Sequence, residues 1–294
     1  MAVPEEQLAT WAKQGSVTQS ASTYQTVKAA LEDPSAPFHN RTFDVFLQGS
    51  YGNDTNIYAD SDVDIAIRLS STVYADTSKL EGVELQRYKN DFSRADYQLT
   101  DFKADVLAWL RHKFGNSVDP GKKAIRIPAN GSRRDADVLV CAQHLNYGTS
   151  REHYHDGIIF WTTDGVQIVN YPKQHLQNCT SMNQATYSRF KANVRVVKNL
   201  RNRMIHLGKL KDDIAPSYFL EGMLWNAPNQ LYTGSYQTTF ENYMSWLEAA
   251  NHTDLTCANG IHWLLREGHP VCWRKEKFDT FRLAAIQYWK QPNH

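Results

Sequence analysis

The chain has 294 residues and a formal net charge of +1, from 32 Lys and Arg against 31 Asp and Glu. This length can form one large domain or two lobes with their own cores. The balanced charge excludes a generally basic coat for nucleic acid, so small nucleotides are the expected partners. The four cysteines are far apart and follow neither zinc-site nor disulfide spacing, which fits a reducing cytoplasm.

The first element along the chain is helical. Residues 6–32 carry apolar side chains at helical spacing, with an interruption near Gly15. The residues before it lack the basic and apolar regions of a signal peptide, and no later apolar run reaches the length of a membrane span. We therefore expect a cytoplasmic protein without a membrane partner.

Strand patterns dominate the first half of the chain and helical patterns the second. The expected strands lie at 43–48, 62–69, 124–128, 136–141 and 158–162, with a charged helical stretch at 84–113. The later helices are expected at 185–206, 216–226, 236–250, 257–266 and 276–289. This order predicts an α+β protein of two lobes with a boundary near Tyr171-Pro172, because proline blocks continuation of a strand.

Two acidic segments lead into apolar strands. Asp62 and Asp64 alternate with Val63 and Ile65, so a strand here turns both carboxylates to one face and buries the aliphatic side chains on the other. Asp137 precedes an apolar run in the same way. If its strand pairs beside the first, the three carboxylates form a cup for two divalent ions, as phosphoryl transfer requires.

Other interpretations of the acidic residues are available. An Asp-x-Asp pair is common in surface hairpins, and the third carboxylate is what favours a metal site. Asp135 lies on the same face as Asp137, but Asp137 is adjacent to the apolar run, as Asp64 is. Upstream, Gly49 and Ser50 follow the apolar run 43–47 and offer backbone N–H groups to a phosphate.

The helical half carries a cationic pattern. Lys191, Arg195 and Lys198 recur at spacings of four and three beside an apolar stripe. Such a face is usually solvated; the alternative is that Lys198 or a neighbour reaches a nucleotide triphosphate as a point charge.

A Pro-Ser-Tyr sequence at 216–218 predicts the start of the next helix. Proline before the first turn and a serine able to cap it are typical of a helix N-terminus, which attracts anions. Ser217 would then donate to a phosphate, while Tyr218 either packs in the core or stacks on a base.

These segments resemble one family, the bacterial cGAS/DncV-like nucleotidyltransferases (CD-NTases) of anti-phage CBASS operons. The similar segments occur in the family's order, at 11–16, 47–64, 170–175, 190–201 and 216–221. The resemblance covers roughly residues 8 to 289. Asn53 and Asp54 resemble the subgroup called clade E, some members of which use uridine nucleotides.

The resemblance implies both a fold and a division of the chain. The fold is a polymerase-β-like core sheet with a long N-terminal spine helix and a helical C-terminal lobe. Residues 1–171 would be the nucleotidyltransferase catalytic core, and residues 172–294 the helical lobe that completes the nucleotide cleft.

The resemblance also assigns roles to individual residues. It implies that Asp62, Asp64 and Asp137 are catalytic and bind two Mg²⁺, with Mn²⁺ as a substitute. The donor nucleotide would be held by Gly49 and Ser50 at a phosphate, by Lys198 and Ser217 at the triphosphate, and by Tyr218 at the base.

The implied reaction makes a cyclic oligonucleotide, above all a cyclic dinucleotide, from ATP, UTP or GTP by two successive transfers. The product would reach the CBASS effector, and without a zinc-binding thumb no activation by DNA is implied. Two alternatives stay open, namely template-free transfer to an RNA end or a small molecule, and a non-catalytic nucleotide sensor. The net charge gives an RNA track no support. Base specificity is also open, with Asn170, Asn178 and Asn183 as unranked readers.

Overall fold

The computed structural model describes residues 3–15, 17–58 and 62–291. The chain divides into two compact units. Unit 1 comprises Met1–Ser16, Gly49–Asp60 and Lys173–His294, and unit 2 comprises Val17–Gln48 and Ser61–Pro172. The chain therefore passes between the units after residues 16, 48, 60 and 172. The crossing after residue 172 lies at the boundary that the sequence suggests. The assignment of functions to residues 1–171 and 172–294 stays a prediction.

Unit 2 is built on a mixed sheet with the strand order β1-β2-β4-β5-β6, and β3 pairs with β4. The strands are β1 (Phe43–Leu47), β2 (Val63–Asp76), β3 (Ile125–Ile127), β4 (Ala136–Tyr147), β5 (Tyr154–Trp161) and β6 (Gln167–Asn170). Strands β2 and β4 are parallel, and each other pair is antiparallel. Parallel pairing brings the first residues of β2 and β4 to one edge of the sheet.

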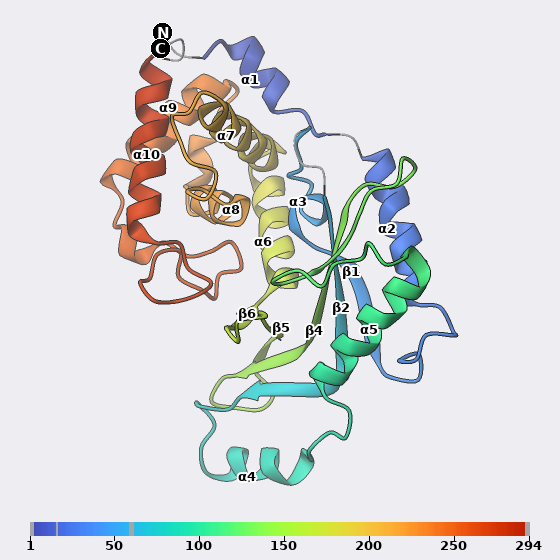
Figure 1. Cartoon of the computed structure of the whole chain (residues 1–294). Coiled ribbons are helices and arrows are strands. Elements are labelled where there is room, and N and C mark those ends of the chain that lie inside the picture. Colours follow the sequence, from blue (N-terminus) through green and yellow to red (C-terminus); the bar gives the residue numbers. More distant parts are fainter. Residues whose placement is uncertain (1–2, 16, 59–61, 292–294) are drawn as a thin grey trace. The chain divides into compact units, whose positions relative to one another are not determined.

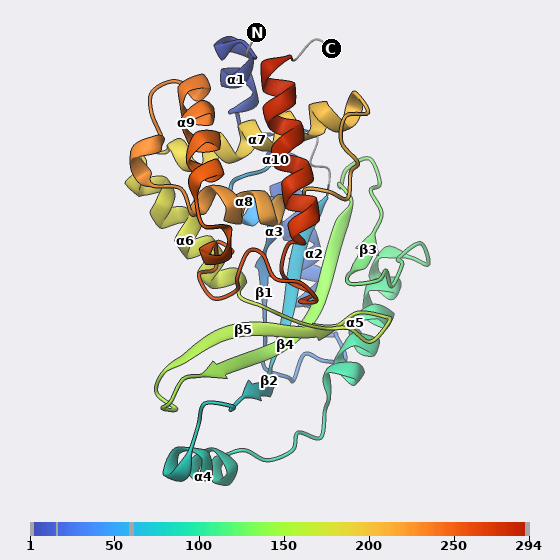
Figure 2. The same ribbon diagram turned by 90° about the vertical axis from the view of Figure 1, so that its left-hand side faces the viewer.

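Helices cover one face of this sheet. Both α2 (Thr18–Leu31) and α5 (Leu99–Phe114) pack against it and against each other (Figure 1). The shorter α4 (Gly82–Asp91) lies beyond the end of β2 (Figure 2). The long helix expected at 84–113 is therefore wrong, because a capping box between Gln98 and Asp101 starts a new helix at Leu99.

Unit 1 is helical around α7 (Arg189–His206), which packs against four other helices. The helices of this unit are α1 (Glu5–Trp11), α3 (Gly49–Gly52), α6 (Pro172–Ala185), α8 (Ser217–Trp225), α9 (Tyr236–Ala249) and α10 (Lys275–Lys290), with 3₁₀ turns at Asn229–Leu231 and His252–Asp254. The apolar stripe of α7, including Phe190, Val194 and Leu200, is fully buried in the core. Among the described residues, no helix combines the length and apolarity that crossing a membrane requires.

Two helical expectations need correction. The segment 257–266 is irregular, because Gly260 adopts a φ of +68° and the side chain of Asn259 accepts hydrogen bonds from the N–H groups of Ile261 and His262. The single long spine helix implied by the resemblance is two helices, α1 and α2, and the interruption expected near Gly15 is confirmed. A Cβ on Gly15 would lie 2.5 Å from the carbonyl oxygen of Ile57, so the break at Gly15 permits a close backbone approach.

Candidate active site

The predicted acidic residues gather at the start of β2 and β4. Asp64 on β2 is the register partner of Asp137 on β4, and Asp62 directly precedes β2. Val63 and Ile65 are fully buried, as the alternation predicts. Register partners share a face of the sheet, and residues two apart in a strand do too. The structure thus confirms the pairing of the two acidic strands.

This arrangement fits divalent cations. Burial, followed by the charge of Asp62, raises the pKa of the Asp137 carboxyl above its ordinary value, so ionising it without a cation is unfavourable. Carboxylate oxygens are the ligands that Mg²⁺ takes in phosphoryl-transfer sites. The rival Asp135 has a different role, because its Oδ1 accepts hydrogen bonds from Arg126 Nη2 at 2.7 Å and from Ala129 N at 3.3 Å.

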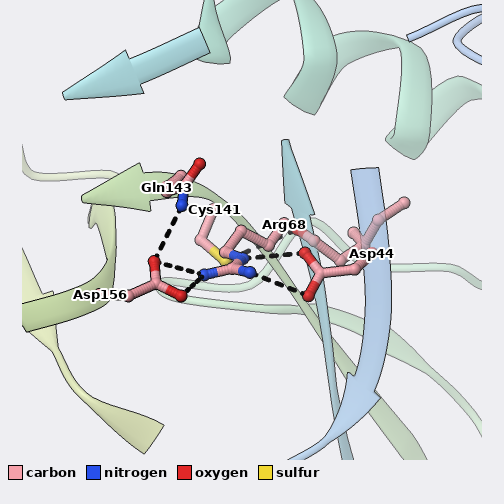
Figure 3. A network of polar contacts seen from close by, with 6 residues as sticks. Asp44, Arg68, Cys141, Gln143 and Asp156 are labelled. Atoms are coloured by element: carbon pink, nitrogen blue, oxygen red, sulfur yellow. Dashed lines mark hydrogen bonds and ion pairs between the residues drawn. The ribbon is translucent and has the colours of Figure 1, made fainter. Parts of the chain in front are cut away.

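A charged network that was not predicted from the sequence lies on the same face of the sheet. Figure 3 shows its side chains. Arg68 donates from Nε and Nη2 to the two carboxylate oxygens of Asp44, at 2.8 and 3.1 Å, and from Nη1 to those of Asp156, at 2.9 Å each. Gln143 also donates to Asp156, at 3.0 Å. Arg68 is the register partner of Cys141, which lies four residues beyond Asp137 on β4. In the sequence, this network is indicated only by Arg68, a single arginine inside an apolar strand.

The three candidate base readers lie in different surroundings. Asn170 on β6 pairs with Ile158, which pairs with Gln143, so Asn170 lies on the same sheet face as the carboxylates. Asn178 uses its amide to bind the carbonyl oxygen of Ala258 at 2.9 Å. Asn183 accepts a hydrogen bond from the backbone N–H of Lys191 at 3.0 Å.

Gly49 and Ser50 belong to a compact segment of unit 1, residues 49–55, that we call the Gly-Ser loop. Gly49 has a φ of +63°, in the left-handed region that favours glycine. The N–H of Asn53 donates to the Gly49 carbonyl at 3.1 Å, and the N–H of Thr55 donates to the Ser50 carbonyl at 2.9 Å. The loop is therefore closed by its own backbone.

The cationic face of α7 binds this loop. Lys191 forms an ion pair with the Asp54 carboxylate at 2.9 Å, and Arg195 Nη1 donates to the Asp54 carbonyl at 2.7 Å. Lys198 is completely buried and donates from Nζ to the Thr55 carbonyl at 3.0 Å. The interpretation of this face as solvated is wrong, and contact of Lys198 with a triphosphate stays a prediction.

Ser217 and Tyr218 lie in the first turn of α8. The helix is preceded by Pro216 without a side-chain cap, so the capping role of Ser217 is wrong; its hydroxyl accepts a hydrogen bond from Arg201 Nη1 at 3.2 Å. Tyr218 is half-buried, with its ring stacked 5.0 Å from that of His175. The proposed contacts of Ser217 with a phosphate and of Tyr218 with a base stay predictions.

A second titratable cluster, also missed by the sequence analysis, is buried in unit 1. His175, Cys179 and Glu221 have potential metal-ligand atoms within 4.8 Å of one another. However, His175 Nε2 lies only 2.6 Å from Glu221 Oε2. Two such ligands around one tetrahedral zinc would be about 3.3 Å apart, given metal bonds of about 2.0 Å. The cluster is thus a hydrogen-bonded network as it stands.

Comparison with known proteins identifies the family of the chain. A family model described as the cGAS/DncV-like nucleotidyltransferase C-terminal helical domain matches residues 177–290. The chain is 36% identical to the cyclic UMP-AMP synthase of Rhodothermus marinus, covering 98% of both chains. It is 34% identical to the cyclic dipyrimidine nucleotide synthase CdnE of Legionella pneumophila, covering 97% of both.

A solved structure shows the same fold. The structure of Rhodothermus marinus CdnE c-UMP-AMP synthase with Apcpp and Upnpp matches with a TM-score of 0.89 and 34% identity, over 99% of this chain and 98% of that one. The polymerase-β-like α+β fold expected from the sequence is confirmed by this match. The chain therefore belongs to the cGAS/DncV-like nucleotidyltransferases, in the CdnE group, and is a nucleotidyltransferase.

Proposed function

We propose that this enzyme joins nucleoside triphosphates into a cyclic dinucleotide that contains at least one uridine and signals in anti-phage defence. The observation that carries the proposal is the parallel pairing of Asp64 with Asp137 in a chain of the CdnE group. The uridine is proposed because one relative is a cyclic UMP-AMP synthase and another a cyclic dipyrimidine synthase.

The three carboxylates would hold the divalent cations, two Mg²⁺ with Mn²⁺ as a substitute. When bound, these ions supply Lewis-acid activation of the acceptor ribose hydroxyl and neutralise charge at the α-phosphate. The backbone of Gly49 and Ser50 would orient a donor phosphate, and Lys198 would add a positive charge at the triphosphate. A second transfer at the same residues would close the ring.

The product, rather than the enzyme, would carry the signal to an effector in the cytoplasm. This scheme requires no DNA.

The test of this function is product analysis. We would incubate purified protein with the four α-³²P-labelled nucleoside triphosphates and Mg²⁺ or Mn²⁺, treat with phosphatase, and identify resistant products by chromatography and mass spectrometry. We expect a cyclic dinucleotide, and no product from the double variant Asp62→Asn/Asp64→Asn, with an unchanged circular dichroism spectrum. Label found only in an elongated RNA would instead support the alternative transferase, and synthesis by the double variant would refute the metal site.

Base choice can be tested at Asn170. A carboxamide can donate and accept at once, and the order of donors and acceptors along the Watson–Crick edge differs between uracil and adenine, so a carboxamide held in one orientation can favour uracil. We expect Asn170→Ala to lower incorporation of uridine relative to adenosine by at least tenfold when the four nucleotides compete. Asn178→Ala is the control, because its amide binds the Ala258 carbonyl, and it should leave the base ratio unchanged. An unaltered ratio in Asn170→Ala would exclude Asn170 as a base reader.

A further inference from the structure

Glu221 binds the Gly-Ser loop from the side of α8. Glu221 is 2% exposed, and its carboxylate accepts hydrogen bonds from Asn53 Nδ2 at 3.0 Å and from the hydroxyl of Thr55. The third partner is Nε2 of His175 on α6, at 2.6 Å. One buried carboxylate thus holds two side chains of the loop and one of a helix.

Neighbouring groups compensate for the burial of the Glu221 carboxylate. An isolated buried carboxylate is strongly unfavourable unless it is hydrogen-bonded and paired with a positive charge. Burial raises the pKa of Glu221, but the hydrogen bond and charge of His175 and the charge of Lys198 outweigh it and hold the pKa below its ordinary value. Glu221 is therefore an ionised acceptor at neutral pH.

Asn53 and Thr55, which Glu221 binds, lie on either side of a residue with an unusual backbone conformation. Asp54 has a φ of +54°, which residues other than glycine seldom adopt. Asn53 and Thr55 on either side are bound by Glu221, while Asp54 itself is bound by Lys191 and Arg195. A conformation of this kind persists only where the surrounding structure fixes it.

The held residues are also coupled to the predicted phosphate-binding backbone. The N–H of Thr55 donates to the carbonyl of Ser50 at 2.9 Å, and the N–H of Asn53 donates to that of Gly49 at 3.1 Å. A shift of Asn53 or Thr55 would therefore be transmitted to Gly49 and Ser50.

We propose that Glu221 is a positioning residue for nucleotidyl transfer, which fixes the Gly-Ser loop through Asn53 and Thr55 in the conformation that binds the donor phosphate. This inference rests on the proposed function, since it takes the loop as the donor-phosphate site. In this role Glu221 acts through Asn53 and Thr55 rather than directly on the nucleotide.

The first variant is Glu221→Gln, which keeps the side-chain volume but has only one acceptor oxygen for three donors. Its matched control is Glu5→Gln in the same unit, because Glu5 also accepts three hydrogen bonds, from Ser235, Tyr236 and Gln237. Both variants should lower Tm. Only Glu221→Gln should raise KM for the donor nucleotide and Kd for a non-hydrolysable triphosphate analogue, by about 10- to 100-fold.

A second pair of variants covers the possibility that Glu221→Gln does not fold. Thr55→Val removes the hydroxyl that donates to Glu221 at nearly constant shape, and Thr55→Ser keeps it. We expect Thr55→Val to weaken analogue binding by about tenfold and Thr55→Ser to recover most of that loss. The combination Glu221→Gln/Thr55→Val should be little worse than Glu221→Gln, because the two changes remove the same contact.

Three results bear on the proposal. Glu221→Gln with a lowered Tm but wild-type KM and Kd, matching Glu5→Gln, would show a purely structural role and overturn it. Stoichiometric zinc in the purified protein that Cys179→Ser removes would also overturn it, by making the cluster a metal site. Analogue binding needs no turnover, so a wild type that binds the analogue but forms no cyclic product would refute the proposed function alone.

Discussion

Asp137 illustrates how one residue can serve the site at the expense of the fold. Its folded-state pKa is raised, by burial first and then by the charge of Asp62. A raised carboxyl pKa gives stability that is present below the ordinary pKa and lost as the pH rises through the folded pKa. At neutral pH the ionised Asp137 therefore opposes folding of the metal-free protein.

The variant Asp137→Asn should make this visible. In EDTA at pH 7.5 we expect its Tm to rise by about 2 °C, because a charge is removed from the acidic cluster. Mg²⁺ should stabilise the wild type but not the variant, and the variant should make no product. Differential scanning fluorimetry with and without Mg²⁺ measures both effects. Asp135→Asn is the control and should lower Tm, since Asp135 is paired with Arg126 at 2.7 Å.

The ionisation of Glu221 predicts a pH dependence with the opposite sign. Its folded-state pKa is lowered from 4.5, so the stability it gives is present above that value and lost as the pH falls through the folded pKa. Groups that face it are His175, Lys198 and Cys179. Urea unfolding of wild type and Glu221→Gln should therefore show a difference in unfolding free energy that is largest at pH 6–7 and shrinks below pH 4.5. A constant difference down to pH 3 would mean that folding does not lower the pKa of Glu221.

Residues whose positions follow from local patterns could be predicted from the sequence, and residues whose contacts are made far along the chain could not. The common face of Asp62 and Asp64 follows from strand alternation, which is a local rule, and the pairing expected for Asp137 is confirmed by its register with Asp64. The catalytic role of these three residues stays a prediction. Lys198 looked like part of a solvated face because its partner, the Thr55 carbonyl, is 143 residues away and is a main-chain atom. Glu221 could not be assigned a role from the sequence, because its partners Asn53 and Thr55 are 168 and 166 residues away.

At the scale of elements, the Arg68 network joins β2, which carries Asp64, to two other strands of the sheet. It connects Asp44 on β1, Arg68 on β2 and Asp156 on β5, and the side chains of Asp44 and Asp156 are 39% and 28% exposed. Removing one partner of a buried charged network leaves the others without compensation. Because both carboxylates are partly exposed, water can replace some of the hydrogen bonds that are lost with Arg68.

We therefore expect Arg68→Met to lower the unfolding free energy by about 2–3 kcal/mol in urea titrations. The control is Lys122→Met, because Lys122 and Asp164 form an ion pair whose side chains are 65% and 52% exposed. A surface pair of this kind contributes at most about 1 kcal/mol. Equal effects of the two variants would show that the network adds nothing beyond a surface pair.

Elements with a long regular pattern were predictable, and those defined by partners were not. The strands beginning at Phe43 and Val63 and the helix α10 follow the apolar periodicity closely. The four-residue strand β6 is too short for a pattern, and it exists through its pairing with β5. In the segment 257–266 the apolar spacing suggested a helix, but the side-chain hydrogen bonds of Asn259 favoured a turn.

At the scale of the whole molecule, unit 1 depends on segments far apart in the chain. Glu5 binds the first turn of α9, through the backbone N–H groups of Tyr236 and Gln237 at 2.7 and 2.9 Å. The Gly-Ser loop supplies the partners of Lys198 and Glu221. The family model for the C-terminal helical domain, at 177–290, covers neither segment.

Because unit 1 is assembled from separate segments of the chain, we predict that residues 172–294 do not fold alone. Without the Gly-Ser loop, Lys198 would lose the Thr55 carbonyl, and Glu221 would lose its hydrogen bonds from Asn53 and Thr55. Leaving buried charges without these partners costs several kcal/mol, a large part of the stability of a domain of this size. We expect the isolated fragment to give a poorly dispersed ¹H–¹⁵N NMR spectrum and no cooperative thermal transition, whereas the full chain gives both. A cooperative transition in the fragment would mean that these long-range contacts refine the helical unit after it has formed, and that its core alone determines its fold.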